Sequence, residues 1–389
     1  MNDESNRSLF QTAYDELYSW CRQHDFAGHD PFDALNSRLF QATPLAQSRN
    51  ARFIWTQLVK RSPADVRALA RVPAERNAKG IALFALAQIA NYRREKTKAA
   101  GVQEFLSWLM AMRVDGYSGA AWGYNFDWQS RNFFASHDTP TIVPTAFAAR
   151  ALIEGRDLSD EYLKAARSVC DFILKDLPRS VETESEVCFS YAPQSDTKIF
   201  NASLLAAEVL ACVGQLTGET ELLKLAERAT RYVVNNQQPD GSWSYGTNPK
   251  QAWKDNFHTA YILFSLKRII DVSSAKEEFQ PALERGYHFW KTNFFLAEGW
   301  PKYYDDDPYP VDTHAAASAI VTFLECRDLD PDASRLAQHV ANWTIRNLRD
   351  SRGFFYYQKR RFYTVRKPYM RWTQAWMLYA LSRLLEELN

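Results

Sequence analysis

The sequence contains little that would divide the chain into separate domains. It has 389 residues, and no stretch rich in glycine, serine or proline interrupts it. A chain of this length often forms two or three domains, and linkers of that composition usually join them. The absence of such a linker favours one large domain.

Cysteine is scarce, and the spacing of the cysteines excludes two kinds of site. The five cysteines are odd in number, and no two of them form a Cys-x-x-Cys pair. Neither a disulfide framework nor a zinc ribbon is indicated, and such thiols are typical of a reduced compartment. We predict no metal ion and no cofactor. The cysteines are Cys21, Cys170, Cys188, Cys212 and Cys326.

Long apolar runs and an excess of one charge are also missing. The first six residues are polar, and no run approaches the roughly 18 apolar residues that a membrane span requires. The chain has 47 basic and 46 acidic residues, so its net charge of +1 gives no overall attraction to nucleic acid. We therefore expect a cytoplasmic protein with no membrane span and no nucleic-acid partner.

What the sequence does contain is a repeat of apolar segments. Small residues open six such segments at intervals of about 55–64 residues. A period of this length holds two helices and a connection, and such a unit buries its apolar face only against its neighbours. Six hairpins of this kind can close into a ring. The six marker residues are Ala82, Ala146, Ala202, Ala260, Ala315 and Ala375.

Amphipathic segments alternate with the apolar ones. Residues 219–236 are an example, with apolar residues recurring every three or four positions. The six marked segments are apolar on nearly all sides, which predicts an inner ring covered by an outer, amphipathic set. Residues 6–23 or 50–61 should supply the remaining outer helix. The other outer helices are expected at about 101–113, 159–176, 219–236, 277–295 and 332–348.

Aromatic loops connect each outer helix to the next inner helix. One of them reads Asp240-Gly-Ser-Trp-Ser-Tyr, and similar segments begin at Asp115, Glu298 and Ser351. Because the repeat always runs from outer helix through long loop to inner helix, these loops should share one rim. Binding residues concentrate on loops held by a rigid scaffold, so this rim is the expected ligand site.

The segment Gln238-Pro-Asp-Gly-Ser-Trp243 resembles the Gln-Trp repeat of triterpene cyclases. With the hairpin ring, it is similar to the α/α-toroid superfamily, which includes terpene cyclases, protein prenyltransferases, glycan lyases, unsaturated-uronyl hydrolases and uronyl C5-epimerases. The resemblance implies an all-α (α/α)6 toroid. We expect a single domain in which residues 1–76 are a helical segment completing the ring and residues 77–389 form the toroid.

Motifs of the terpene branch are absent. Asp305-Asp306-Asp307-Pro308 is not a DDxxD pattern, and Val311-Asp312-Thr313-His314 has one carboxylate where protonating cyclases have three. No Cys/His/Asp zinc set like that of prenyltransferases is present. A terpene-cyclase-like enzyme is therefore the weaker alternative.

Polar residues collect where the inner helices begin, and they supply the candidate site. His137, His258 and His314 lie at this one level. Asp and Asn at such positions also cap helices, so Asp138, Asn201, Asp255 and Asp312 have a structural alternative. We predict His258, His314, Tyr304 and His137 as catalytic. The predicted substrate-binding residues are Trp122, Tyr124, Asp138, Asn201, Trp243, Asp255, Trp300, Tyr303, Asp312, Arg361, Arg366, Tyr369 and Arg371.

Residues 356–372 are basic and aromatic and contain no acidic residue. One interpretation is a solvated β-hairpin edge that its charges protect from aggregation. The other is a binding surface beside the positive ends of the inner helices, where guanidinium groups suit carboxylates and aromatic faces suit sugar rings. The second interpretation predicts an acidic oligosaccharide or polysaccharide as ligand.

The rim has the groups needed to remove the C5 proton of a uronic acid: a cation for the carboxylate, and His or Tyr as base and acid. With the superfamily resemblance, this favours an epimerase or lyase of polysaccharide biosynthesis that acts beside other polysaccharide-assembly enzymes. A glycoside hydrolase using two of Asp138, Asp255 and Asp312 is one alternative. A non-catalytic glycan-binding subunit of an assembly complex is another.

Overall fold

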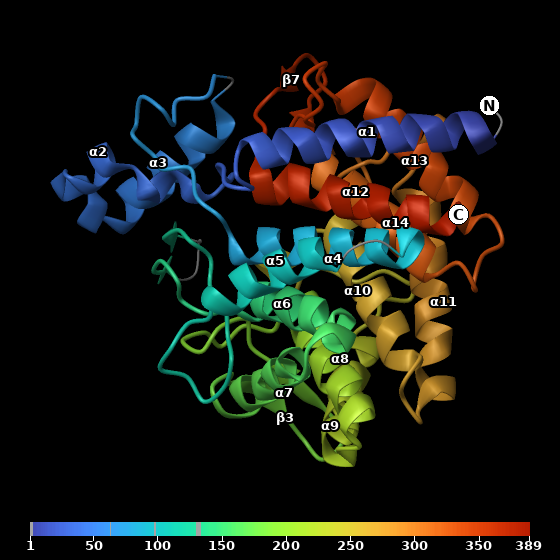
Figure 1. Cartoon of the computed structure of the whole chain (residues 1–389). Coiled ribbons are helices and arrows are strands. Elements are labelled where there is room, and N and C mark those ends of the chain that lie inside the picture. The colour runs from blue at the N-terminus through green and yellow to red at the C-terminus, as the bar shows by residue number, and fades with distance from the viewer. Residues whose placement is uncertain (1–2, 63, 97–98, 130–133) are drawn as a thin grey trace.

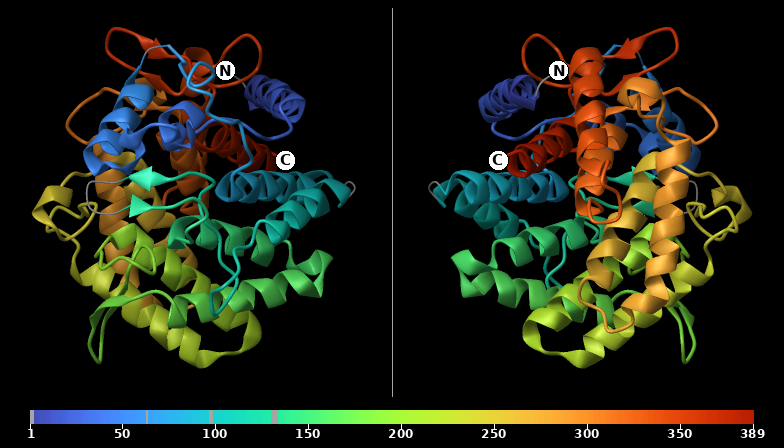
Figure 2. Two further views of the ribbon diagram at one scale, coloured as in Figure 1. Left: turned by 90° about the vertical axis from the view of Figure 1, so that its left-hand side faces the viewer. Right: turned by 90° about the vertical axis from the view of Figure 1, so that its right-hand side faces the viewer.

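The structure is a computed structural model that describes residues 3–62, 64–96, 99–129 and 134–389. Six helices form an inner ring (Figures 1 and 2), each contacting the next in chain order, and the last returns to the first. Their burial on all sides follows from their lack of a polar face. They are α4 (Ala78–Glu95), α6 (Ile142–Glu154), α8 (Phe200–Thr217), α10 (Asn256–Ile270), α12 (Thr313–Glu325) and α14 (Trp376–Glu387).

A second set of helices covers this ring. Each outer helix packs against the inner helix of its own hairpin, and the first helix of the chain packs against α14. The predicted all-α toroid of six hairpins is therefore confirmed. The outer helices are α1 (Asp3–Gln23), α5 (Ala100–Ala111), α7 (Asp160–Lys175), α9 (Thr220–Asn235), α11 (Lys276–Asn293) and α13 (Ala333–Leu348).

The long connections all lead into the N-terminal ends of the inner helices, and they carry the short strands. Asn77, Asp255 and Asp312 cap α4, α10 and α12 through their side chains, which fixes where these helices begin. The strand pairs are antiparallel: β1 (Trp128–Gln129) with β2 (Phe134–Ala135), β3 (Arg179–Glu182) with β4 (Val187–Phe189), and β6 (Gln358–Lys359) with both β5 (Val311–Asp312) and β7 (Thr364–Val365).

The segment after α1 leaves the ring and projects beside the rim (Figure 1). It packs around its own small cluster of Leu35, Phe40 and Ala46. Helix α1, and not α3, thus takes the sixth outer position against α14. The elements of this projection are η1 (Asp33–Asn36), α2 (Arg38–Gln41), η2 (Pro44–Gln47) and α3 (Arg49–Arg61).

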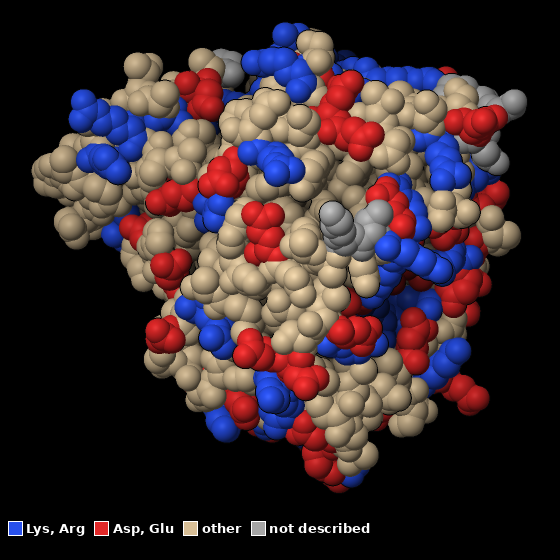
Figure 3. Space-filling model, in the orientation of Figure 1, with Lys and Arg blue, Asp and Glu red and all other residues tan. Residues whose placement is uncertain are grey.

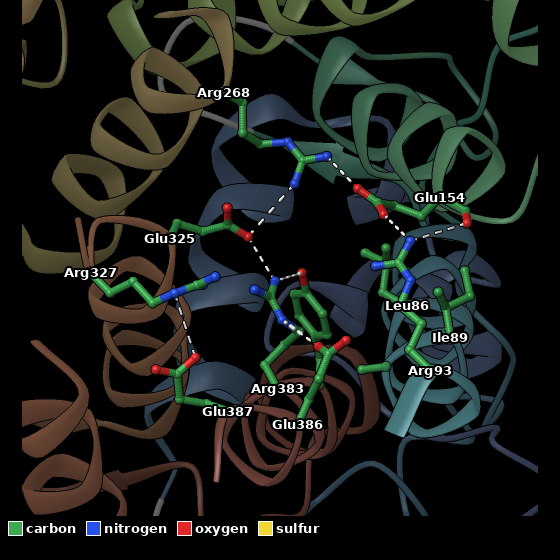
Figure 4. Close-up of a pocket in the computed structure, with 12 residues that line it drawn as sticks. Leu86, Ile89, Arg93, Glu154, Arg268, Glu325, Arg327, Arg383, Glu386 and Glu387 are labelled. Atoms are coloured by element: carbon green, nitrogen blue, oxygen red, sulfur yellow. Dashed lines mark hydrogen bonds and ion pairs between the residues drawn. The ribbon is translucent and has the colours of Figure 1, made fainter. Parts of the chain in front are cut away.

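Ion pairs occupy the opposite end of the ring, around a pocket of about 430 Å³ (Figure 4). Arg268 pairs with Glu154 at 2.6 Å and also reaches Glu208 and Glu325. Arg383 pairs with Glu325 at 2.7 Å. We call Arg268, Arg383 and these three glutamates the rear network. The network thus holds buried charges of both signs.

The face drawn in Figure 3 shows basic and acidic residues interspersed, in agreement with the balanced composition. Within the described residues, one helix, α8, is long and apolar enough to meet the length and composition of a membrane span. It lies in the inner ring and is mostly buried, as the core helix of a ring would be. Packing inside the ring therefore explains why α8 is so apolar.

Candidate functional site

A cavity of about 740 Å³ opens at the rim with the long loops. Its floor is formed by the first turns of the inner helices and by η6 (Met370–Ala375), a π-helical turn that runs directly into α14. Such turns often occur at functional sites. Phe32 and Lys60 of the N-terminal projection complete one wall.

Several of the predicted site residues meet in this cavity. They come from five different repeats, as expected if the long loops share one rim. Two of them keep a buried polar atom that has no hydrogen-bond partner, the amide oxygen of Asn201 and Nδ1 of His314. Unpartnered buried atoms cost free energy unless a ligand satisfies them. The predicted residues in the lining are Tyr124, Asn201, Asp255, His258, Tyr303, Tyr304, His314 and Arg371.

The predicted tryptophans have a different position. The Trp122 and Trp243 rings are fully buried, and their indole N–H groups donate to the carbonyl oxygens of Leu109 and Val233 at 2.7 and 2.8 Å. The indole of Trp300 donates to the carbonyl of Pro308. All three rings lie outside the cavity lining. Trp122 and Trp243 anchor their loops to outer helices, and the ring of Trp300 packs on Trp343 of α13.

His137 and Asp138 also lie outside the cavity lining. Their side chains are exposed and pair with each other at 2.8 Å, and this carboxylate raises the pKa of His137. Asp138 has a φ of 61°, and the backbone of the turn passes closely over Gly123. The pair belongs to the turn that leads to α6.

Of the lysines and arginines in residues 356–372, only Arg371 reaches the cavity lining, beside Trp372. Arg361 and Arg366 are exposed on the hairpin, beside the rings of Phe362 and Tyr356. Tyr369 is buried against the guanidinium of Arg67. The interpretation of residues 356–372 as a solvated β-hairpin edge thus accounts for most of the charged side chains in this segment.

Asp312 lies behind the cavity wall. It is fully buried, caps α12, and accepts hydrogen bonds from Gln358 at 2.5 Å and from the indole of Trp372 at 3.0 Å. Burial raises the pKa of Asp312 to about 6, although these hydrogen bonds act in the opposite direction. Its contacts are those of a structural carboxylate.

The first histidine of the cavity is oriented by a carboxylate. Asp255 accepts from the backbone N–H of His258 at 2.9 Å and lies 2.6 Å from its Nδ1. Because Nδ1 bonds to the carboxylate, Nε2 is left to act as proton acceptor or donor. Among the described residues, none bonds to Nε2.

The second histidine belongs to a chain of three side chains. Nε2 of His314 lies 2.7 Å from the Tyr261 hydroxyl, which accepts from Nζ of Lys79, also at 2.7 Å. All three are buried. Burial lowers the pKa of His314 well below its ordinary value, helped by the charges of Lys79 and Arg371.

Both imidazoles pack on one aromatic ring. The centroid of Phe257 lies 3.9 Å from that of His258 and 4.6 Å from that of His314. Two groups that exchange protons therefore flank the same part of the cavity, one paired with a carboxylate and one with a tyrosine and a lysine.

Lys60 and Arg371 are two of the four basic residues among the described lining residues, with Lys79 and Lys250. Arg371 donates through Nε to Asp30 at 2.6 Å; burial disfavours its charge, but Asp30 raises its pKa overall. Burial lowers the pKa of Lys60 to about 8, against the attraction of Asp312 and Asp30. No described residue accepts a hydrogen bond from Nζ of Lys60, so this cation is available to a ligand.

Sequence reasoning missed Lys79, Tyr261, Lys60 and Asp30. A lysine in the first turn of an otherwise apolar helix was a signal for Lys79, because a charge there needs a partner. Asp30 had no comparable signal, since its partner Arg371 is 341 residues away. Among the described residues, no group of three His, Cys, Asp or Glu side chains is placed to hold a metal ion.

No protein-family model and no curated protein sequence matches the chain. Solved structures do. A cellobiose 2-epimerase from Bacillus thermoamylovorans B4167 shares 12% identity at a TM-score of 0.62, covering 82% of this chain and 90% of its own. A sugar epimerase from a ruminal bacterium gives 14% identity and the same TM-score and coverage.

A glycosyl hydrolase of family 88 from Bacteroides vulgatus is 10% identical, with a TM-score of 0.56, and covers 78% of this chain and 91% of its own. These neighbours share the α/α-toroid fold with the chain. At such identities the likeness establishes the fold, so function must be argued from the site.

Proposed function

We propose that the protein is a carbohydrate-processing enzyme that removes and returns a proton at a ring carbon of an acidic sugar, the C5 carbon of a uronate. The observation that carries this proposal is the pair His258 and His314, which share one cavity and have opposite electrostatic partners. His258 bonds to the carboxylate of Asp255, whereas burial and nearby cations lower the pKa of His314 and favour its neutral form. Two imidazoles with different surroundings are thereby available as acid and base.

The rest of the cavity supports a sugar acid as substrate. Lys60 and Arg371 supply positive charge for a carboxylate, which must be neutralised before a proton is removed from the carbon beside it. Aromatic rings from several loops, including Tyr124 and Trp253, offer faces for a pyranose. The two epimerases among the structural neighbours favour the same class of reaction by analogy of fold.

The hydrolase alternative has less support. It requires two carboxylates about 5–9.5 Å apart that face one bond. Among the described lining residues, Asp255 is the single carboxylate, since Asp138 lies on an exposed turn and Asp312 behind the wall. A terpene-cyclase-like function rests on the aromatic lining alone.

The test is incubation with uronate-containing oligosaccharides in deuterated water, followed by NMR, with cellobiose as the neutral comparison. We expect deuterium at C5 of the uronate. His258→Ala and His314→Ala should each lower the rate at least about 100-fold, the lower end of a general acid–base contribution. The exposed His288 of α11 provides the control, because His288→Ala should leave the rate unchanged.

Other outcomes would overturn the proposal. Exchange in cellobiose alone would remove the acidic sugar from it, and release of a reducing sugar without exchange would favour hydrolysis. Tight binding of uronates with neither result would identify a non-catalytic glycan-binding protein.

A further inference from the structure

Lys79, Tyr261 and His314 join three inner helices across the centre of the ring. Lys79 lies in the first turn of α4, Tyr261 lies in α10, and His314 lies in α12. The lysine Nζ lies 4.4 Å from the ring centroid of Phe147 and 4.9 Å from that of Tyr261, and it donates to the Tyr261 hydroxyl at 2.7 Å. The chain of hydrogen bonds ends at Nε2 of His314.

The other nitrogen of that imidazole has no hydrogen-bond partner in the part of the chain that the structure describes. Nδ1 of His314 is buried without a hydrogen-bond partner, and the residue lines the cavity. Because Nε2 is bonded to Tyr261, Nδ1 is the nitrogen left for a ligand in the cavity, which would reach it by displacing the side chains that cover it. Whether it meets a donor or an acceptor depends on which nitrogen carries the proton.

Hydrogen-bond direction links that choice to the lysine. An ammonium on Lys79 donates to Tyr261, so Tyr261 donates to Nε2 and the neutral imidazole carries its proton on Nδ1. A neutral amine can accept from Tyr261 instead. Tyr261 then accepts from Nε2–H, and Nδ1 presents a lone pair to the cavity.

We propose that Lys79 is the proton store of His314, coupled to it through the Tyr261 hydroxyl, and that the charge of Lys79 sets whether Nδ1 donates or accepts a proton in the cavity. Lys79 is thus a positioning residue for proton transfer. This inference rests on the proposed function only for its consequence in catalysis.

The surroundings favour the lysine as the place where the proton is kept. Burial raises the pKa of Tyr261 and lowers that of His314, so neither phenolate nor imidazolium is the resting form. Burial, with Arg371 and Arg150, lowers the pKa of Lys79 well below its ordinary value, and Asp30 acts against this. His258 is a further titratable group near His314, and it acts to lower the pKa of His314 in the same direction as the nearby cations.

Proton transfer along His314, Tyr261 and Lys79 is balanced in either direction. When Nδ1 takes the proton from a sugar carbon, the C–H electron pair stays on the sugar, beside its carboxylate. The Nε2 proton passes to the Tyr261 oxygen, and the Tyr261 proton passes to Nζ. The products are a neutral imidazole, a phenol and an ammonium, and the reverse sequence returns a proton to the carbon.

One experiment needs no sugar. In the full chain labelled with ¹⁵N-histidine, NMR reports the tautomer of His314 as pH is varied, with His314→Ala used for assignment. We expect a change from Nδ1–H to Nε2–H as pH rises, and we expect Lys79→Met or Lys79→Gln to abolish it. A single tautomer at all pH values in the parent chain, or an unchanged transition in both variants, would overturn the proposal.

The second experiment uses the deuterium-exchange assay. Lys79→Met and Tyr261→Phe should each lower exchange at least about tenfold, and the double variant should be no slower than the slower single variant, because both interrupt one pathway. Tyr261→Phe keeps the ring that fills the core. Multiplied losses in the double variant would contradict a shared pathway.

Lys291 and Tyr287 provide a matched control. Both bond to Asp330 on the outer layer, at 2.6 and 2.9 Å, away from the cavity lining. Lys291→Met and Tyr287→Phe should leave exchange unchanged. If the parent chain exchanges no sugar, the proposed function fails, and the tautomer measurement still decides the inference about Lys79.

Discussion

At the scale of single residues, the cavity shows how one residue type takes different roles according to its neighbours. Asp255 and Asp312 both cap inner helices, but only Asp255 also faces the cavity and bonds to an imidazole. The N-cap position explains the presence of both aspartates, and the second partner separates a candidate functional residue from a structural one.

Asp312 gives a prediction for stability against pH. Because its pKa is about 6 in the folded protein and 3.8 ordinarily, the unfolded chain loses this proton first as pH rises. The contribution of Asp312 to the free energy of unfolding is therefore complete below about pH 4 and lost by pH 6. The change amounts to about 3 kcal/mol at 1.36 kcal/mol per unit.

Urea unfolding of the parent chain and of Asp312→Asn between pH 4 and pH 6.5 tests this. The difference between the two free energies should change with pH in the stated direction, because Asn has no proton to lose. Glu154 and Glu325, whose pKa values are about 2, have the opposite dependence, but both proteins contain them. Parallel curves would contradict the prediction.

At the scale of elements, the six apolar segments and their amphipathic partners were predictable because both signals are local. A helix without a polar face must be buried, and Asp255 and Asp312 marked where two of these helices begin. The loops were less predictable. Trp122 and Trp243 have the composition of sugar-binding residues but fill gaps between helices.

The floor of the cavity was beyond local reasoning for a geometric reason. Lys79 meets Tyr261 across the ring, 182 positions later in the chain, and only the closed toroid brings the two together. The same holds for Asp30 and Arg371. Sequence patterns placed His258 and His314 at the rim but could not show what lies behind each imidazole.

The N-terminal projection gives a prediction at this scale. Arg67 is fully buried and donates to Asp33 and to the carbonyl oxygen of Asp30, both at 2.7 Å, which closes the base of the projection. Its guanidinium also lies 4.7 Å from the ring centroid of Tyr369, which links the projection to the segment before α14. Arg67→Met would leave the Asp33 carboxylate without its main partner, at a cost of roughly 3–5 kcal/mol. We expect faster amide hydrogen exchange in η1 and α3.

The same variant should weaken binding of an acidic sugar, because Phe32 and Lys60 would lose their positions. Arg61→Met, on the exposed side of α3, is the control. Equal acceleration of exchange in α10 would show that the whole fold had been destabilised and not the projection.

At the scale of the whole molecule, buried charges hold the rear of the ring. Arg268 serves three glutamates from α6, α8 and α12. Arg268→Met should lower the free energy of unfolding by roughly 1.5–3 kcal/mol, because it removes charged hydrogen bonds, while Arg93, Arg150 and Arg383 still pair with the three glutamates. The exposed pair of Arg231 and Glu278 is the comparison, and Arg231→Met should cost at most about 1 kcal/mol. Urea unfolding would measure both losses, and equal losses would contradict this role.

The packing between the rear network and the cavity also limits which substrates can reach the site. Between the network and the cavity lie the packed rings of Phe147, Phe264 and Trp376, all of them buried. The cavity is therefore closed at its inner end and does not pass through the toroid. If the ligand is a polysaccharide, the chain cannot be threaded through the ring, so the sugar that reaches His258 and His314 must be a chain end, a side branch or a short free oligosaccharide.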